Sequence, residues 1–241
     1  MKKTLPLFMV TILFFALSVP TASGQNLAWF QDRLVSYLEK PRVLAMGWSK
    51  DGKWAAVSPI DTGGRGGTAV RLISMDAIED TILFDKAVWS DEVEQIGEGT
   101  VSLAEAMAGS QTWRDFLTLC GRLRIARPGE GEEELQPFPF QSRSALIGVR
   151  TDITVDADVG EYGSKSISYR LVAESSAKGE KTITSGKVAD AYEIVADGYS
   201  LSPFEPRMVV AFSIFRAGFE GDRVRMNGFS GCKLDTGFKK K

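Results

Sequence analysis

The hydrophobic pattern of the chain is clearest around the pair Asp51-Gly52. Two apolar runs, at 43–48 and 53–58, flank this pair, and an Asp-Gly turn between such runs predicts a β-hairpin. Residues 68–75 and 81–88 are rich in β-branched and apolar side chains and read as two further strands. The stretch therefore predicts an antiparallel β unit.

A related pattern returns near the C-terminus. Gly198-Tyr199-Ser200 resembles Gly47-Trp48-Ser49, and the apolar run 207–213 takes the place of 53–58. A glycine-containing connection and a further strand follow in both places. We interpret the two stretches as two copies of one β unit.

The rest of the C-terminal part also has the short period of strands. Half-buried alternation is clearest at 146–157, where Ile147, Val149, Ile153 and Val155 are expected on the buried face. Further strands are expected at 166–174, 181–185, 191–199, 208–215, 223–226 and 231–234.

Two segments have helical spacing instead. The first, near 27–39, carries Leu27, Phe30, Leu34 and Leu38 and ends before Pro41. The second, near 103–120, carries Trp113, Phe116, Leu117 and Cys120 on one face, with Gly121 as a C-terminal cap. The predicted fold class is mainly β (α+β), with antiparallel sheets from two related β units and these two helices.

The first 24 residues have the pattern of a secretory signal. Lys2 and Lys3 precede an apolar run at 5–19, and the small residues Ala22-Ser23-Gly24 follow it. We expect cleavage before Gln25, a periplasmic or secreted location, and no membrane span after cleavage.

The mature chain is expected to have two halves. Residues 25–127 form an N-terminal α+β half, and 142–241 form a C-terminal β half. Between them, 128–141 reads as a linker or long surface loop because it holds four glutamates and the run Pro137-Phe138-Pro139-Phe140. We expect these glutamates to stay solvated.

Composition excludes several functions. The chain has no histidine, which rules out Ser-His-acid and Cys-His catalysis and His-ligated zinc. The formal net charge of −2 becomes −4 without Lys2 and Lys3, so a nucleic-acid partner is not expected. Cys120 and Cys232 are candidates for one disulfide in an oxidising compartment, or for two buried thiols.

Residues 48–56 read Trp-Ser-Lys-Asp-Gly-Lys-Trp-Ala-Ala. Over about 44–75 the chain resembles a repeat of TolB-type β-propellers. Those proteins fold each repeat as a four-stranded blade, and many are periplasmic binding platforms. The resemblance implies a blade-like sheet here and a role in binding.

The sequence Asp-Thr-Gly occurs twice, beginning at Asp61 and at Asp235. It resembles the catalytic loops of aspartic proteases, in which two carboxylates share a proton and activate water. The resemblance implies a carboxylate-only hydrolase, including a single-loop, retropepsin-like form that would use Asp61 alone. Asp and Gly also favour turns by themselves.

Weaker candidates complete the set. Asp156 and Asp158 could offer oxygen ligands to Ca²⁺, although the EF-hand spacing is incomplete. Phe138, Phe140 and Phe204 lie in proline-rich stretches and are candidate contacts for a partner.

The leading hypothesis is a cell-envelope binding or structural module without catalytic activity, with a protein partner and no cofactor. The alternative is the carboxylate hydrolase.

Overall fold

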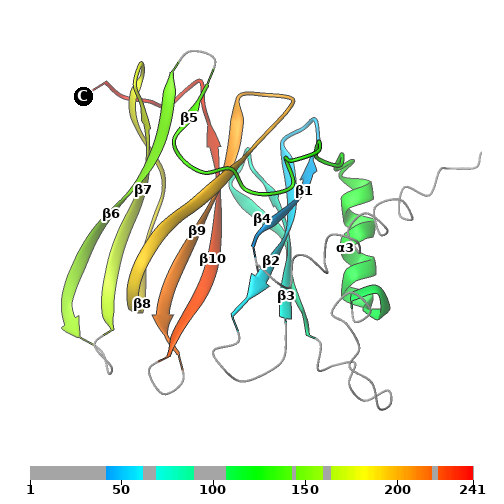
Figure 1. Cartoon of the computed structure of the whole chain (residues 1–241), viewed down its shortest axis with the longest axis horizontal. Helices are drawn as coiled ribbons and strands as arrows, with labels where there is room; N and C mark the ends of the chain where they lie inside the picture. Colours follow the sequence, from blue (N-terminus) through cyan, green and yellow to red (C-terminus); the bar gives the residue numbers. More distant parts are fainter. Residues whose placement is uncertain are drawn as a thin grey trace, which may run out of the picture.

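The computed structural model describes residues 42–61, 69–89, 107–142, 145–159, 164–218 and 222–240. Within these residues two antiparallel sheets and one long helix form three layers, as Figure 1 shows: sheet B, then sheet A, then the helix α3. The predicted mainly β, antiparallel fold is confirmed. The predicted signal and the helix expected near 27–39 lie outside the described residues.

Sheet A is a four-stranded meander in the order β1-β2-β3-β4. Its strands are β1 (Leu44–Trp48), β2 (Lys53–Ile60), β3 (Ala69–Asp76) and β4 (Thr81–Trp89). The predicted Asp-Gly turn joins β1 to β2, and Gly52 has φ +78, a backbone conformation that glycine adopts without strain. All four predicted strands are therefore present, with ends shifted by at most two residues.

Sheet B has six strands in the order β10-β9-β8-β7-β6-β5. They are β5 (Phe140–Gln141), β6 (Leu146–Val159), β7 (Lys165–Ser175), β8 (Gly179–Leu201), β9 (Arg207–Ala217) and β10 (Arg223–Lys233). The separate strands expected at 223–226 and 231–234 are one strand, because β10 pairs with β9 without interruption from Arg223 to Lys233.

The strands expected at 181–185 and 191–199 are also one element, the bent strand β8. Its first part pairs with β7, and its second part, from Ala191 onward, pairs with β9. The bend lies at Asp190, whose φ of 55° is in the left-handed region that Asp tolerates. Polar residues at this bend look like a loop in the sequence, but the hydrogen-bonded ladder continues through them.

The two related β units have the same local construction. In each, the first strand has a β-bulge just before a glycine: between Ala45 and Gly47, and between Ala196 and Gly198. Each glycine then lies opposite an alanine of the second strand. The two units lie in different sheets, which pack against each other through β2 and β10.

The contact between the sheets is mostly apolar, with one buried hydroxyl at its centre. Trp54 of β2 packs on Phe229 of β10, with ring centroids 5.4 Å apart. The indole Nε1–H groups of Trp48 and Trp54 both donate to Ser200 Oγ of β8, at 3.0 and 3.2 Å. Each indole N–H group would cost about 1–3 kcal/mol if it were buried without an acceptor. The Ser200 hydroxyl therefore favours the packing of the sheets in which both indoles reach it.

The opposite face of sheet A packs on α3 (Gln111–Arg122) through Trp113, Phe116 and Cys120. Ser110 caps the start of α3 and separates it from the helical residues 107–109, whereas residues 103–106 of the predicted helix lie outside the described residues. The helix ends beyond the predicted cap Gly121, because Arg124, with φ 54°, donates to Gly121 O and Ile125 donates to Cys120 O. This pair of bonds is a Schellman motif with arginine at the usual glycine position.

Sheet B has an inner face, which carries Met208, Val210 and Phe212, and an outer face, which carries Val209 and Ser213 and packs on sheet A. The expected burial of β6 holds only at one end of the inner face. Ile147 is buried, whereas Ile153 and Val155 are 42% and 49% exposed. A second apolar cluster, which includes Ile167 of β7, continues along this face beside Val155. Because β5 pairs with β6 only at Leu146 and Ile147, the rest of β6 is the edge of the sheet, and its side chains are covered on one side only.

Candidate functional site

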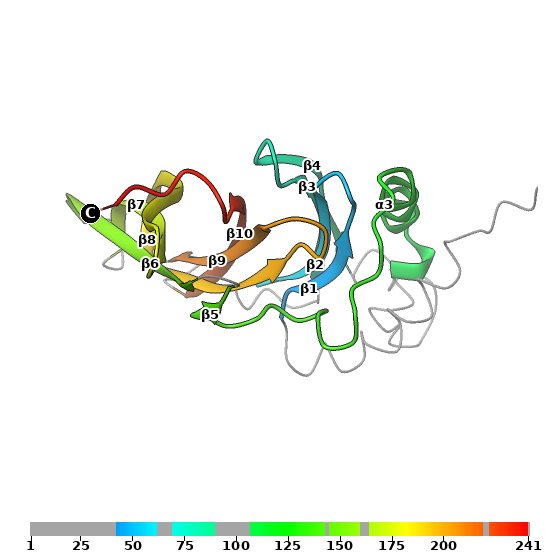
Figure 2. The same ribbon diagram turned by 90° about the horizontal axis from the view of Figure 1, so that it is seen from above.

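Residues 126–141 form a strap that joins the two sheets. Figure 2 shows this segment passing along one side of both sheets on its way from α3 to β5. Ala126 N donates to Trp48 O of β1, and Gln136 N donates to Tyr199 O of β8, both at 2.8 Å. The strap therefore binds matching residues of the two β units.

Glycine at matching positions lets the strap approach both strands. A Cβ atom on Gly47 would lie 1.7 Å from Ala126 O, and one on Gly198 would lie 2.6 Å from Gln136 O. Of the four glutamates that were expected to be solvated, Glu130, Glu132 and Glu134 are exposed. Glu133 is buried, and Glu134 forms an ion pair with Arg42.

The aromatic pair Phe138 and Phe140 packs within the protein. Both rings lie against Tyr199, with centroids 5.1 and 4.3 Å away. Phe140 is buried, and Phe138 is half-buried. Burial among these rings raises the pKa of the Tyr199 hydroxyl. Of the three candidate contact residues, Phe204 is the most exposed, at 42%.

A cavity of about 510 Å³, which we call the inner hollow, lies on the inner face of sheet B at the ends of β8 and β10. Phe140, Phe204 and Asp235, which are far apart in the sequence, all line it. Its apolar wall consists of Phe140, Leu201, Pro203, Phe204, Pro206 and Leu234. Lys178 is at the rim, where its Nζ donates to Leu234 O at 3.0 Å.

A second cavity of about 270 Å³, the outer hollow, lies between the two sheets. Trp48 and Ser200, which belong to the contact between the sheets, line it together with strap residues 126–129 and Glu132. Leu201, Pro203 and Phe204 line both hollows. The end of β8 and the loop that follows it thus separate two cavities on opposite faces of sheet B.

The backbone of Leu201 is open at this place. Tyr199 exchanges hydrogen bonds with Gln136, so its N–H and C=O point away from β9. Because these groups alternate direction along a strand, those of Leu201 point to the same side as those of Tyr199. The strap residue that would lie opposite, Glu134, pairs with Leu44 instead. Within the described residues, neither group of Leu201 has a hydrogen-bond partner.

Asp61, the first candidate catalytic carboxylate, lies at the edge of β10. Its Oδ2 accepts the backbone N–H of Arg225 at 2.9 Å. Two more side chains of sheet A act similarly on this edge: Arg71 Nη1 donates to Asn227 O, and Asp80 Oδ1 accepts from Gly231 N, both at 2.6 Å. Asp61 is thus one of three side chains that seal the edge of β10.

Asp235 lies beyond the other end of that strand, where it pairs with Lys233 Nζ at 3.7 Å. From Arg225, which contacts Asp61, to Lys233 the strand rises roughly 27 Å. The structure therefore does not bring Asp61 and Asp235 together, and a shared proton between their carboxylates is not feasible.

The candidate disulfide between Cys120 and Cys232 is wrong. Both thiols are free and buried, Cys120 between α3 and sheet A and Cys232 on the inner face of sheet B. The two clusters lie on opposite sides of the contact between the sheets, so neither thiol can reach the other. Burial raises the pKa of Cys120 to about 12 and that of Cys232 to about 11.

Asp156 and Asp158, the candidate Ca²⁺ ligands, belong to β6. Their side chains lie outside the part of the chain whose side chains the structure describes. Among the residues with described side chains, no three His, Cys, Asp or Glu residues gather as a metal site would require. Within the same part of the chain, no helix has the length and apolarity needed to cross a membrane.

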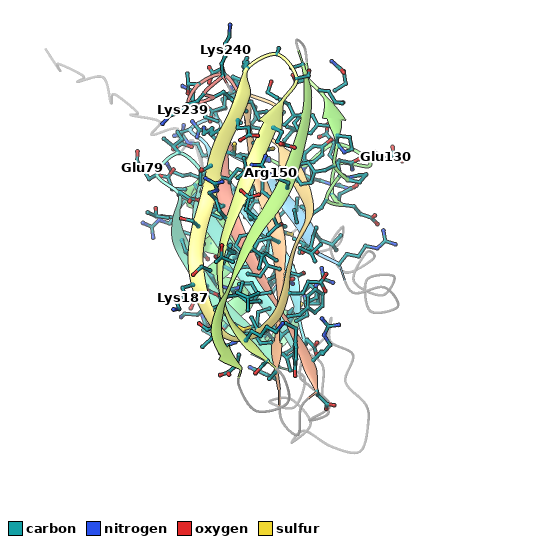
Figure 3. All side chains as sticks on the ribbon, turned by 90° about the vertical axis from the view of Figure 1, so that its left-hand side faces the viewer. Glu79, Glu130, Arg150, Lys187, Lys239 and Lys240 are labelled. Carbon is teal, nitrogen blue, oxygen red and sulfur yellow. The ribbon has the colours of Figure 1, made fainter. Side chains whose placement is uncertain are left out.

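A half-buried cluster of charges lies on the outer face of β6, β7 and β8, around the residue labelled Arg150 in Figure 3. Arg150 pairs with Asp152 and Glu180, both at 2.8 Å, and with Glu174. Hydrogen bonds from Arg150 and Arg170 lower the pKa of Asp152 to about 2. The cluster thus holds two guanidinium groups, those of Arg150 and Arg170, against three carboxylates, and each of these groups is ion-paired.

Sequence reasoning identified Phe140, Phe204 and Asp235 but missed Leu201 and the strap. No motif marks Leu201, since its importance comes from a missing backbone partner. The glycines Gly47 and Gly198 were the available signal for a close backbone approach.

Comparisons with models of known protein families, with curated proteins and with solved structures give no match. The TolB-type resemblance of 44–75 stays a prediction.

Proposed function

We propose that this protein is a non-catalytic binding module of the cell envelope that holds a protein partner at the inner and outer hollows. The observation that carries the proposal is that Phe140, Phe204 and Asp235 line one cavity of about 510 Å³. Ligand sites are typically concave and mostly apolar, with a few polar groups that orient the ligand. The TolB-type resemblance, which implies a binding platform, points the same way.

The alternative hydrolase is not proposed, because Asp61 accepts a backbone N–H of β10 and Asp235 is roughly 27 Å away along that strand. A digest of denatured protein substrates at acidic pH tests this part. We expect wild type and Asp61→Asn to give equal, negligible cleavage. Cleavage by the wild type that Asp61→Asn abolishes would contradict a non-catalytic role.

A comparison of three baits tests the binding role. Wild type, Phe204→Asp and Ile82→Asp are immobilised and exposed to a cell-envelope extract. Phe204 and Ile82 are similarly exposed, at 42% and 46%, but Ile82 lies in β4, away from the hollows. We expect the same protein to be retained by wild type and Ile82→Asp and lost with Phe204→Asp. Retention by all three baits would remove the hollows as the binding site.

A further inference from the structure

The geometry points to an extended polypeptide segment as the ligand, bound as an added β-strand beside Leu201. This inference rests on the proposed binding role and names the chemistry of the partner. It follows from three features at one place: an unpaired backbone edge, a hollow on each face of the sheet at that edge, and balanced charges around them.

The unpaired edge offers one donor and one acceptor. Tyr199 and Gln136 exchange both of their hydrogen bonds, N–H to O at 2.8 and 2.9 Å. A strand residue placed opposite Leu201 would repeat this exchange two residues further along β8. Backbone pairing of this kind is how sheet edges bind extended peptides, and it is independent of the peptide sequence. The following Pro203 has no N–H group, so the open edge is confined to Leu201.

The two hollows match the period of such a strand. Directly opposite residues in a sheet place their side chains on the same face, and successive residues alternate between faces. Leu201 faces inward, so the peptide residue opposite it would direct its side chain to the inner hollow. The place opposite Ser200 is already held by strap residue Leu135, so the peptide continues only on the Ser202 side, where its next residue would face the outer hollow.

The space beside Leu201 is not filled by the described protein. The strap pairs with β8 at Gln136 but with β1 at Glu134. We call the opening that this leaves beside Leu201, between β8 and β1, the fork. The outer hollow of about 270 Å³ adjoins Leu201, and residues 126–129 also line it. The exposed side chains of Leu201 and Phe204, at 43% and 42%, lie between the two hollows.

The charges around the hollows favour a neutral, apolar segment. Arg207 is ion-paired with Glu205 at 2.8 Å, and Asp235 lies within 3.7 Å of Lys233. The outer hollow contains one charged residue of each sign, Arg127 and Glu132. No excess of either sign is present to select an anionic or cationic ligand. Specificity would come from apolar side chains of the peptide on alternate faces.

Selection from a display library of short linear peptides against the full-length protein tests the inference. Phe204→Asp serves as the counter-selection bait and Ile82→Asp as the control. We expect enriched peptides to bind wild type and Ile82→Asp but not Phe204→Asp. Methylation of the backbone nitrogen at one central position should weaken binding about tenfold, because it removes the donor to Leu201 O. Methylation of the adjacent nitrogens should have much less effect.

A pair of variants at Leu201 tests the other hydrogen bond. Leu201→Pro removes the N–H that points into the fork, whereas Leu201→Ala keeps it. The ladder to β9 loses no bond in either variant, because this N–H points away from β9. We expect Leu201→Pro to bind the selected peptide about tenfold more weakly than Leu201→Ala. Hydrogen exchange at the Leu201 amide should slow on peptide binding in the wild type.

Three results would overturn the inference. Phe204-dependent peptides that tolerate N-methylation at every position and leave the Leu201 amide unprotected would exclude strand pairing. An absence of enriched peptides, together with Phe204-dependent retention from the extract, would exclude a linear peptide while leaving the proposed binding role intact. Sedimentation that shows a concentration-dependent dimer, lost in Leu201→Pro, would make a second copy of this chain the occupant.

Discussion

The edge of β10 and the end of β8 are both places where a strand of sheet B lacks a neighbouring strand, yet the protein treats them differently. At β10, three side chains of sheet A bind backbone groups at Arg225, Asn227 and Gly231. At β8, the backbone groups of Leu201 point into a fork between two hollows and have no partner in the described residues. One edge is sealed, and the other is open.

The difference indicates which edge is available for binding. An unpaired edge is a site for association with other chains, and proteins usually block such edges with charges, bulges or covering segments. Here the blocking groups come from Asp61, Arg71 and Asp80, so the packing of the two sheets and the sealing of β10 depend on each other. The opening at Leu201 remains despite the nearby strap, which turns to β1 instead.

The largest effect is expected at the sealed edge from Gly231→Ala. A Cβ atom there would lie 2.2 Å from Ala77 O, a backbone atom of the β3–β4 turn, so the sheets must move apart. We expect a loss of about 3 kcal/mol in the free energy of unfolding, measured by urea denaturation. The control is Gly121→Ala in α3, where no atom lies within 4 Å and a gain of up to about 1 kcal/mol is expected. Equal effects would contradict the close contact.

Asp80→Ala should have the next largest effect. Asp80 accepts from Gly231 N at 2.6 Å and Ser230 Oγ at 2.9 Å, and its φ is 54°. Loss of both bonds, with alanine in a left-handed conformation, should cost about 2 kcal/mol of unfolding free energy. Asp80→Asn keeps an acceptor oxygen and tolerates this φ, so it should lose less than half as much. If the two variants were equally stable, the sealing role of Asp80 would be wrong.

Acid should weaken the sealed edge through Asp85. Its carboxylate accepts Nε–H and Nη2–H of Arg71, both at 2.6 Å, and these bonds lower the pKa of Asp85. A lowered pKa contributes stability above the unfolded value of about 3.9, and this stability is lost as pH falls through the folded value.

The stability difference between wild type and Asp85→Asn should therefore be largest at neutral pH and approach zero in strong acid. Because the Asp85 side chain is 41% exposed, we expect less than about 1 kcal/mol even at neutral pH. Thermal unfolding of both proteins across this pH range provides the measurement. A difference that grew on acidification would have the wrong sign.

The smallest effect is expected at the open edge. Phe204→Asp replaces a side chain that is 42% exposed, and the change in unfolding free energy should stay within about 0.5 kcal/mol. Ile82→Asp, with similar exposure on β4, should behave alike in the same urea experiment. A loss comparable to that of Asp80→Ala would mean that the loop after β8 supports the fold and is not simply a binding surface.

The strands could be predicted from sequence because their signal is local. The apolar runs on either side of Asp51-Gly52 predicted two strands, and the stretches 68–75 and 81–88 predicted two more. The related pattern near Gly198 indicated the second unit. The continuity of β8 was missed because Asp190 allows a bend that looks like a loop. The far half of β6 was predicted as half-buried, but alternation cannot tell whether anything covers Ile153 and Val155.

The candidate site could be predicted only in part, because its decisive features depend on distant pairing. Phe140 and Phe204 stood out as aromatic residues beside prolines, and both line the inner hollow. Asp61 stood out as a catalytic candidate, but its partner is a backbone amide of β10. The open backbone of Leu201 depends on where the strap turns away, and no residue type signals that.

Ser200 has one further consequence. Its hydroxyl accepts from two indoles, and one of them, that of Trp48, forms part of the outer hollow. A molecule entering that cavity would change the polarity around this ring, while Trp54, fully buried, would stay shielded. The tryptophan fluorescence of the protein should therefore change when a molecule occupies the outer hollow, so binding could be followed without an attached dye.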